Sequence, residues 1–251
     1  FDRFDSSVTL RVGRSRRKRP APEAEEPSPD RPATPQPHVT LSGVGRSAPW
    51  SQFAQLYLAE LKLVFNGLSR WWFIVAAGLA VAGAFPPLGI GRQFILPFAW
   101  VWPLLLWSPM GTRELRHGTH QVLFSTPRVL RRQLPALWLA GVSIAAITGI
   151  GVALRLLIAG DMASLGAWTA GALFIPSLAL ALGTWSGSSK LFEILYLLLW
   201  YMGPLNRVPF LDYVGASEAS VAMGMPLIVA AIIPLLLLVA YLGRRRQSSS
   251  A

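Results

Sequence analysis

The side chains that could carry out catalysis in this chain are few, and most of them lie outside its apolar segments. The 251 residues include three histidines and no cysteine, which excludes disulfides and thiol chemistry. His38 lies in a proline-rich stretch, and His117 and His120 lie in a charged interval between apolar runs. Intramembrane hydrolysis needs a nucleophile and a base, or paired carboxylates, at one depth. The sequence therefore argues against an intramembrane enzyme, and we expect no catalytic residues and no cofactor.

Two further patterns are only weakly similar to functional sites. The run at 183–187 (GTWSG) has the look of a serine-nucleophile turn, but no partner histidine accompanies it, and small residues are ordinary at the end of a membrane helix. Glu114, His117 and His120 have a spacing that a metal could use, yet they lie in an arginine-rich interval with no apparent fourth ligand. We expect no metal site.

The composition indicates a membrane protein. Hydrophobic residues make up 53% of the chain and charged residues 14%, against about 25% charged in soluble domains. A net charge of +11 is compatible with nucleic-acid binding, but nine of the 23 Lys and Arg precede residue 50 and most others stand at the ends of apolar runs. This is the positive-inside pattern of membrane proteins, so we expect membrane lipid and no nucleic acid as a partner.

Residues 1–48 have the composition of a linker. A basic cluster at 14–20 (RSRRKRP) leads into seven prolines between Pro20 and Pro37. Such a segment buries too little apolar area to offset its ordering entropy, so it should be disordered or extended. The cluster is typical either of a nuclear-import or nucleic-acid patch or of a solvated linker drawn to anionic headgroups, and we favour the second. Without an initiator Met or a signal peptide at its start, we expect the natural chain to continue upstream.

An amphipathic helix is predicted over residues 49–70. Its apolar residues recur at spacings of three and four, which places them on one stripe of a helix: Phe53, Tyr57, Leu61, Val64, Phe65 and Leu68. Trp71 and Trp72 follow at once, where an aromatic belt would mark the membrane interface. We interpret this segment as an interfacial helix that leads into the first membrane span.

The remainder of the chain predicts an all-α membrane domain, residues 71–246, with six transmembrane helices and a disordered tail at 247–251. Prolines 97, 103 and 109 should kink the second span, and the fifth is short for a crossing of roughly 20 residues. The expected spans are about 71–90, 93–110, 134–159, 165–184, 191–202 and 223–242.

The interval 111–132 orients these spans. It contains five arginines and one acid, and a basic loop between two spans is cytoplasmic. With six spans both termini are cytoplasmic, and the outer loops hold only Arg92 and Arg207 among the basic residues. Arg155 and Glu193 fall about one turn inside span ends, where snorkelling and pairing with Lys190 are as ordinary as function. A short helix near 208–214 should lie at the outer face.

The same interval resembles the first cytoplasmic loop of type-2 ABC transporter membrane subunits. In that family the loop commonly reads Glu, then Gly-Thr, a short apolar piece and a Ser-x-Pro-like turn with Arg. The corresponding residues in this chain are Glu114, Gly118, Thr119, Val122, Leu123, Phe124, Ser125, Thr126, Pro127 and Arg128. The interfacial helix, the six spans and the segment before the last span are consistent with it, over about residues 51–246.

The resemblance implies a permease half of an ATP-driven exporter in the cytoplasmic (inner) membrane of a bacterium. The chain has no GxxxxGK[ST] loop, so the ATPase would be a separate cytoplasmic subunit. The exporter would need a second permease half, which would be either another copy of this chain in a homodimer or a half fused upstream of it. Thr119 can cap a short helix that Pro127 ends, and Val122, Leu123 and Phe124 can fill a groove on the ATPase. The alternative from another class is a membrane scaffold or assembly factor that moves no substrate.

Overall fold

The computed structural model describes residues 49–113 and 129–249, and these residues form helices and short connections without a β-strand. The predicted linker 1–48 lies outside the described residues, as does the interval 114–128. The expectation of an all-α chain is therefore confirmed for the described part.

Helix α1 (Pro49–Phe65) confirms the helical part of the predicted amphipathic segment. Its apolar stripe faces the protein: Val64 is buried, and Phe53, Tyr57 and Leu61 are half-buried. Gly67, at a φ of +86°, turns the chain into α2 (Arg70–Ala82), and the two helices meet at 106°. Phe65 and Trp72 pack across this bend with ring centroids 6.0 Å apart.

The second apolar segment is broken, as its prolines predicted. It consists of α3 (Leu88–Ile90), a π-helical turn η1 (Gly91–Ile95), α4 (Leu96–Val101) and α5 (Leu104–Trp107). Pro103 has no N–H to continue the ladder, so the helix is interrupted between α4 and α5. The Tyr196 hydroxyl donates to the carbonyl oxygen of Trp100 at 2.8 Å beside this break, which satisfies a carbonyl that the break releases.

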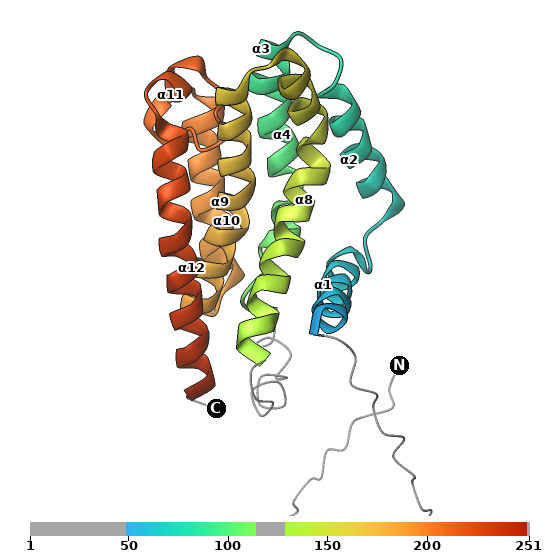
Figure 1. Cartoon of the computed structure of the whole chain (residues 1–251), viewed down its shortest axis with the longest axis vertical. Helices are drawn as coiled ribbons and strands as arrows, with labels where there is room; N and C mark the ends of the chain where they lie inside the picture. Colours follow the sequence, from blue (N-terminus) through green and yellow to red (C-terminus); the bar gives the residue numbers. More distant parts are fainter. Residues whose placement is uncertain (1–48, 114–128, 250–251) are drawn as a thin grey trace, which may run out of the picture. The chain divides into compact units, whose positions relative to one another are not determined.

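Two long helices form the centre. Helix α8 (Val129–Ala159) turns at Gly160 and Asp161 into α9 (Met162–Ser186), and Asp161 caps α9 through the Ser164 N–H at 3.0 Å. Helix α9 is the most buried of the long helices, with 67% of its apolar window inside the protein. It contacts α8, α10 and α12, so it is the axis around which the other helices pack (Figure 1).

The C-terminal third is a second helical pair. Helix α10 (Ser189–Trp200) continues into a π-helical turn η2 (Tyr201–Leu205), and α12 (Met225–Ser249) extends into the predicted tail 247–251. The short helix expected near 208–214 is a 3₁₀ turn, η3 (Pro209–Leu211), followed by α11 (Glu218–Ala222). Val214 is buried there, whereas Phe210 is exposed.

Three described helices are long and apolar enough to cross a bilayer, within residues 132–159, 162–186 and 225–247. The bent pair of α1 and α2 becomes a fourth if it counts as one span. The other expected spans are too short or too interrupted to qualify alone: α2 has 13 residues and α10 has 12. Nevertheless α2, the segment from α3 to α5, α8, α9, α10 and α12 lie alongside one another (Figure 1).

We name the two ends of this bundle by what they contain. The loop end is where α5 and α9 finish and α8 and α10 begin, together with the last turns of α12. The far end holds α3, η1, the turn between α8 and α9, and the segment from η2 to α11. Both ends can be followed in Figure 1, with the loop end at the bottom.

Candidate functional site

The loop predicted to couple the chain to an ATPase lies outside the described residues. This applies to every residue assigned to it: Glu114, Gly118, Thr119, Val122, Leu123, Phe124, Pro127 and Arg128. Its two stems are described, however. One is the turn from Met110 to Arg113 after α5, and the other is the beginning of α8 at Arg132.

Helix α1 contacts both stems of the loop. Arg132 donates from Nη1 to Oε1 of Gln52 at 2.7 Å, and Nη1 of Arg113 lies 3.6 Å from Oε2 of Glu60. Gln52 and Glu60 are eight residues apart on one helix, a rise of about 12 Å. A third contact joins the hydroxyls of Tyr57 and Ser143 at 2.7 Å. The amphipathic helix is thus tied to the chain on either side of the loop.

The first stem also packs directly against α9, and the last turn of α9 packs in turn against α12. A Cβ on Gly183 would overlap the carbonyl oxygen of Met110, and a Cβ on Gly111 would lie 2.9 Å from the Thr184 backbone nitrogen. On the other side, a Cβ on Gly243 would lie 2.9 Å from Oγ1 of Thr184. Glycines therefore bring the loop stem into backbone contact with α9, and they let the end of α12 approach the same turn of α9 at Thr184.

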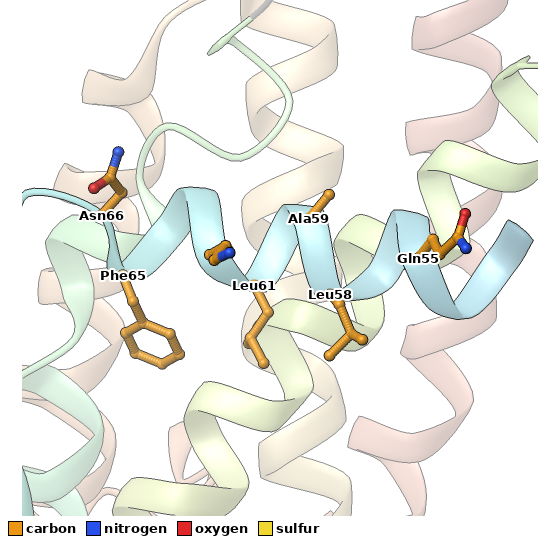
Figure 2. A pocket seen from close by; sticks show the side chains of 7 residues that line it. Gln55, Leu58, Ala59, Leu61, Phe65 and Asn66 are labelled. Atoms are coloured by element: carbon orange, nitrogen blue, oxygen red, sulfur yellow. The ribbon is translucent and has the colours of Figure 1, made fainter. Parts of the chain in front are cut away.

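An open hollow lies along α1 and is bordered by part of the apolar stripe, Leu61 and Phe65, together with residues beside it. This hollow has a volume of about 790 Å³ and is lined by α1 residues. Figure 2 shows Leu58, Leu61 and Phe65 on one side of the helix and Ala59 and Asn66 on the other. Leu58 is 58% exposed beside the exposed Lys62, so this face is available to a lipid surface or to another protein.

Basic side chains surround the remainder of the loop end. Lys190 pairs with Glu193 at 2.7 Å near the beginning of α10, which is the structural one of the two roles that the sequence left open for Glu193. The last turns of α12 present Arg244, Arg245 and Arg246. Arg245 lies over the Tyr241 ring at 5.6 Å from its centroid, and Arg246 lies over the Trp185 ring at 5.8 Å.

The far end contains a buried ion cluster that the sequence did not predict. Arg92, expected in an outer loop, is 7% exposed. Its guanidinium lies 3.5 Å from Asp161 and 3.3 Å from Glu218, and it donates to the Ser164 hydroxyl. Arg92 belongs to η1, and its partners come from the turn between α8 and α9, from the first turn of α9 and from α11, so one side chain joins η1 to these segments.

Hydrogen bonds from Ser164, and then the charge of Arg92, lower the pKa of Asp161 below its ordinary value. Another carboxylate of the far end, Asp212, is buried and accepts from the backbone N–H groups of Ala216 and Ser217 at 3.0 and 2.8 Å. One signal in the sequence could have suggested the cluster. Arg92 and the acids Asp161, Asp212 and Glu218 all fall in connections that the six-span topology places at the same end of the bundle.

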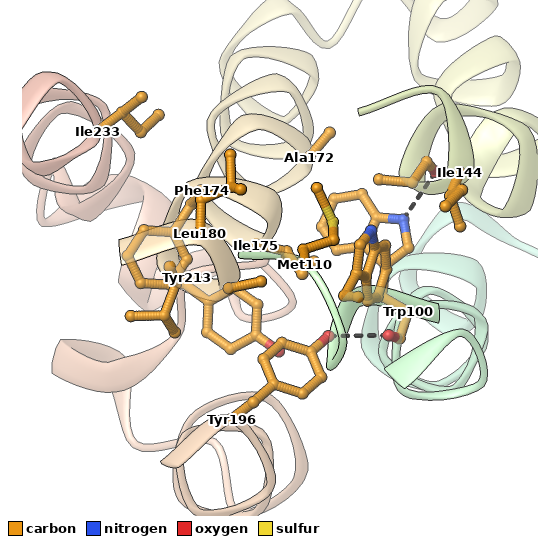
Figure 3. Close-up of a cluster of buried hydrophobic side chains, with 14 of the residues drawn as sticks. Trp100, Met110, Ile144, Ala172, Phe174, Ile175, Leu180, Tyr196, Tyr213 and Ile233 are labelled. Carbon is orange, nitrogen blue, oxygen red and sulfur yellow. Dashed lines mark hydrogen bonds between the residues drawn. The ribbon is translucent and has the colours of Figure 1, made fainter. Parts of the chain in front are cut away.

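The interior is joined by side-chain bonds to backbone carbonyls. Figure 3 shows Tyr196 bonded to the carbonyl of Trp100, and the Trp100 indole bonded to the carbonyl of Ala145. Other indoles do the same between helices: Trp107 to Gly141, Trp168 to Gly149 and Trp200 to Pro97, at 2.9 to 3.1 Å. These contacts fix α8 against α4, α5 and α9, and sequence periodicity does not reveal them.

The weaker candidates have structural explanations. Gly187 adopts a φ of +66° and ends α9, and the Ser186 hydroxyl donates to the Leu182 carbonyl at 2.7 Å, so the run at 183–187 is a helix C-cap. Arg155 is half-buried and donates to the carbonyl of Pro86 at 3.3 Å. Glu114, His117 and His120 lie outside the described residues, and in the part that is described no three His, Asp or Glu side chains gather as metal ligands would.

Comparison with known proteins gave no match. Neither a protein-family model, nor a curated protein, nor a solved structure matches this chain.

Proposed function

We propose that this chain is the membrane-spanning half of an ATP-driven exporter, with six spans and with its loop end in the cytoplasm. The spans would be α2, the broken segment from α3 to α5, α8, α9, α10 with η2, and α12. Their alternating directions place all described lysines and arginines of the loop end on one side. That side is cytoplasmic by the positive-inside rule.

One observation carries the proposal of coupling. The loop's stems are held by α1 on one side, and the first stem lies against the backbone of α9 on the other. A subunit that pulled on the loop would therefore act on the interfacial helix and on the most buried span together. A loop that merely connected two spans would not need backbone packing against a helix seventy residues later in the chain.

The broken segment favours the same function. Interrupted helices in membranes occur where neighbouring groups satisfy the released carbonyls, and they mark places where spans bend. Here Tyr196 of α10 bonds the carbonyl of Trp100 at the break, so α10 and the second span share a polar contact at depth. Such a contact can exchange partners when the halves change conformation.

Co-purification with an ATPase tests the proposal. The full chain is co-expressed with the ATPase encoded beside its gene, and the partner is quantified for wild type, Leu123→Asp and Phe124→Asp. A charge in the apolar piece should abolish recovery of the ATPase, because a desolvated charge is costly in an interface. Wild-type recovery from both variants would refute the docking role.

The matched control is Ser188→Asp. It adds the same charge at the exposed turn of the loop end, and aspartate can still cap α10 as Ser188 does. This variant should retain the ATPase. Failure of the wild-type chain to retain any ATPase, with normal yield and a single oligomeric species, would favour the scaffold alternative.

A further inference from the structure

A small polar cavity lies at the loop end, between the last turns of α9 and α12. Its volume is about 290 Å³, and its lining includes Trp185, Ser186 and Gly187 of α9 with Arg246 and Gln247 of α12. Two larger hollows, one between α9 and α12 nearer the far end and one beside α1, α2 and α8, are lined almost wholly by apolar side chains. This one combines a guanidinium, an amide and a hydroxyl, which is the chemistry of a headgroup rather than of an acyl chain.

The guanidinium of Arg246 is presented at this cavity. It lies over the ring of Trp185. Trp185 is 58% exposed and stands at the end of a span, where aromatic side chains mark the membrane interface. A guanidinium supported on a ring keeps its planar fork of N–H donors, which fits two oxygens of a phosphate. Arg244 and Arg245 precede it and add positive potential at the same end.

Capping of α9 does not require this arginine. The carbonyl of Thr184 accepts from Nε2 of Gln247 at 2.6 Å, that of Gly183 from the N–H of Gly187 at 3.0 Å, and that of Leu182 from Ser186. The last carbonyls of α9 are therefore satisfied by other donors. Those donors belong to Gln247, Gly187 and Ser186, whereas the guanidinium of Arg246 lies over the Trp185 ring at the edge of the cavity.

We propose that this cavity binds the phosphodiester of an anionic phospholipid from the leaflet at the loop end. Arg246 provides the ion pair, Trp185 supports its guanidinium at the interface, and Gln247 and Ser186 form the polar wall next to it. Basic pockets between spans on the cytoplasmic side recognise lipid headgroups in this way. The inference goes beyond transport and needs no ATPase; it rests only on the loop end lying at a membrane surface.

Native mass spectrometry of the full chain in detergent tests the site. Phosphatidylglycerol, phosphatidylcholine and inorganic phosphate are titrated separately against wild type, Arg246→Gln and Arg207→Gln. Arg207 is the matched control, because it also lies over an aromatic ring, Phe94, at 5.4 Å, but at the far end. Wild type should retain one phosphatidylglycerol in preference to phosphatidylcholine. Arg246→Gln should weaken that binding about fivefold, and Arg207→Gln should leave it unchanged.

Arg246→Lys tests whether binding needs the guanidinium geometry or only the positive charge. It also serves as a second variant in case Arg246→Gln does not fold. It should restore part of the affinity, because lysine keeps the charge but loses the bidentate geometry. Equal loss in Arg246→Gln and Arg207→Gln, or no loss in either, would overturn the site. If inorganic phosphate binds in a manner that depends on Arg246 while phosphatidylglycerol does not bind, the ligand of this cavity is free phosphate and the lipid proposal is wrong.

Discussion

The two ends of the bundle differ in their balance of basic and acidic residues. The far end holds three arginines and three acids among the described residues: Arg92, Arg155, Arg207, Asp161, Asp212 and Glu218. Among the residues whose side chains the structure describes, the loop end, with α1 and the start of α2, holds eight basic residues and two acids: Lys62, Arg70, Arg113, Arg132, Lys190, Arg244, Arg245, Arg246, Glu60 and Glu193. Buried Arg92 and Asp212 have their hydrogen bonds inside the protein, whereas Arg245 and Arg246 lie exposed over aromatic rings.

This difference teaches that the positive-inside pattern concerns pairing as well as number. Charges buried at the far end must be matched by the protein, because water is not available to solvate them. Exposed charges at the loop end, such as those of Arg245 and Arg246, can be matched by headgroups or by another subunit, whereas Arg244 is buried there as Arg92 is at the far end. The far end is therefore expected to be the rigid end, and the loop end the end at which partners act.

The largest effect should come from removing the central charge of the far end. Arg92→Met leaves Asp161 without its ion pair and disconnects η1 from α11, so it should lower the free energy of unfolding by about 1–3 kcal/mol. The value falls below that of a fully buried pair because Glu218 is 86% exposed. Arg245→Gln at the loop end should change stability by less than about 0.5 kcal/mol. Thermal unfolding in detergent measures both, and equal losses would erase the contrast between the ends.

A second effect, of similar or smaller size, concerns the glycine contact beneath the loop. Gly183→Ala places a methyl group against the carbonyl oxygen of Met110 and should destabilise the protein by about 1–3 kcal/mol. Gly166→Ala is the control on the same helix, since no atom lies within 4 Å of its added Cβ. That variant should be neutral or stabilise by up to about 1 kcal/mol. A tolerated Gly183→Ala would show that the stem and α9 are not in firm contact.

A pH titration examines the far end alone. The pKa of Asp161 is lowered in the folded protein, so its contribution to stability is present above the ordinary value of 3.8 and is lost as pH falls through the folded pKa. Thermal midpoints should therefore decline below about pH 4 more steeply in wild type than in Asp161→Asn. Parallel curves for the two proteins would contradict the assignment.

The smallest effect should come from the tie between α1 and the loop stem. Glu60→Gln removes the charge opposite Arg113 in a long contact of 3.6 Å between mostly buried side chains, worth about 0.5 kcal/mol, and should raise the rate of tryptic cleavage within residues 113–132 about twofold. Gln55→Ala, on the exposed face of the same helix, is the control and should leave the rate unchanged. An unchanged rate for Glu60→Gln would mean that α1 does not restrain the loop.

Residue spacing and prolines predicted the helices and their breaks, but they did not predict contacts between residues far apart in the sequence. The spacing of Phe53 to Leu61 predicted the inward stripe of α1, and Pro103 predicted the break in the second segment. The pairing of Lys190 with Glu193 was predictable because both lie on one turn.

Arg92 was expected in a loop, because its partners are 69 and 126 positions away and no period in the sequence connects them. The indole bonds from Trp100 and Trp168 are likewise set by helix packing. The coupling role of Leu123 and Phe124 remains a prediction.

Sidedness of the two ends tests the central claim most directly. The chain has no cysteine, so single cysteines can be introduced without a background. Ser188→Cys marks the loop end, and Asn206→Cys marks the far end, both at exposed positions. In intact spheroplasts a membrane-impermeant maleimide should label Asn206→Cys, and it should label Ser188→Cys only after the membrane is opened. Labelling of Ser188→Cys in sealed spheroplasts would place the loop outside and contradict its access to a cytoplasmic ATPase.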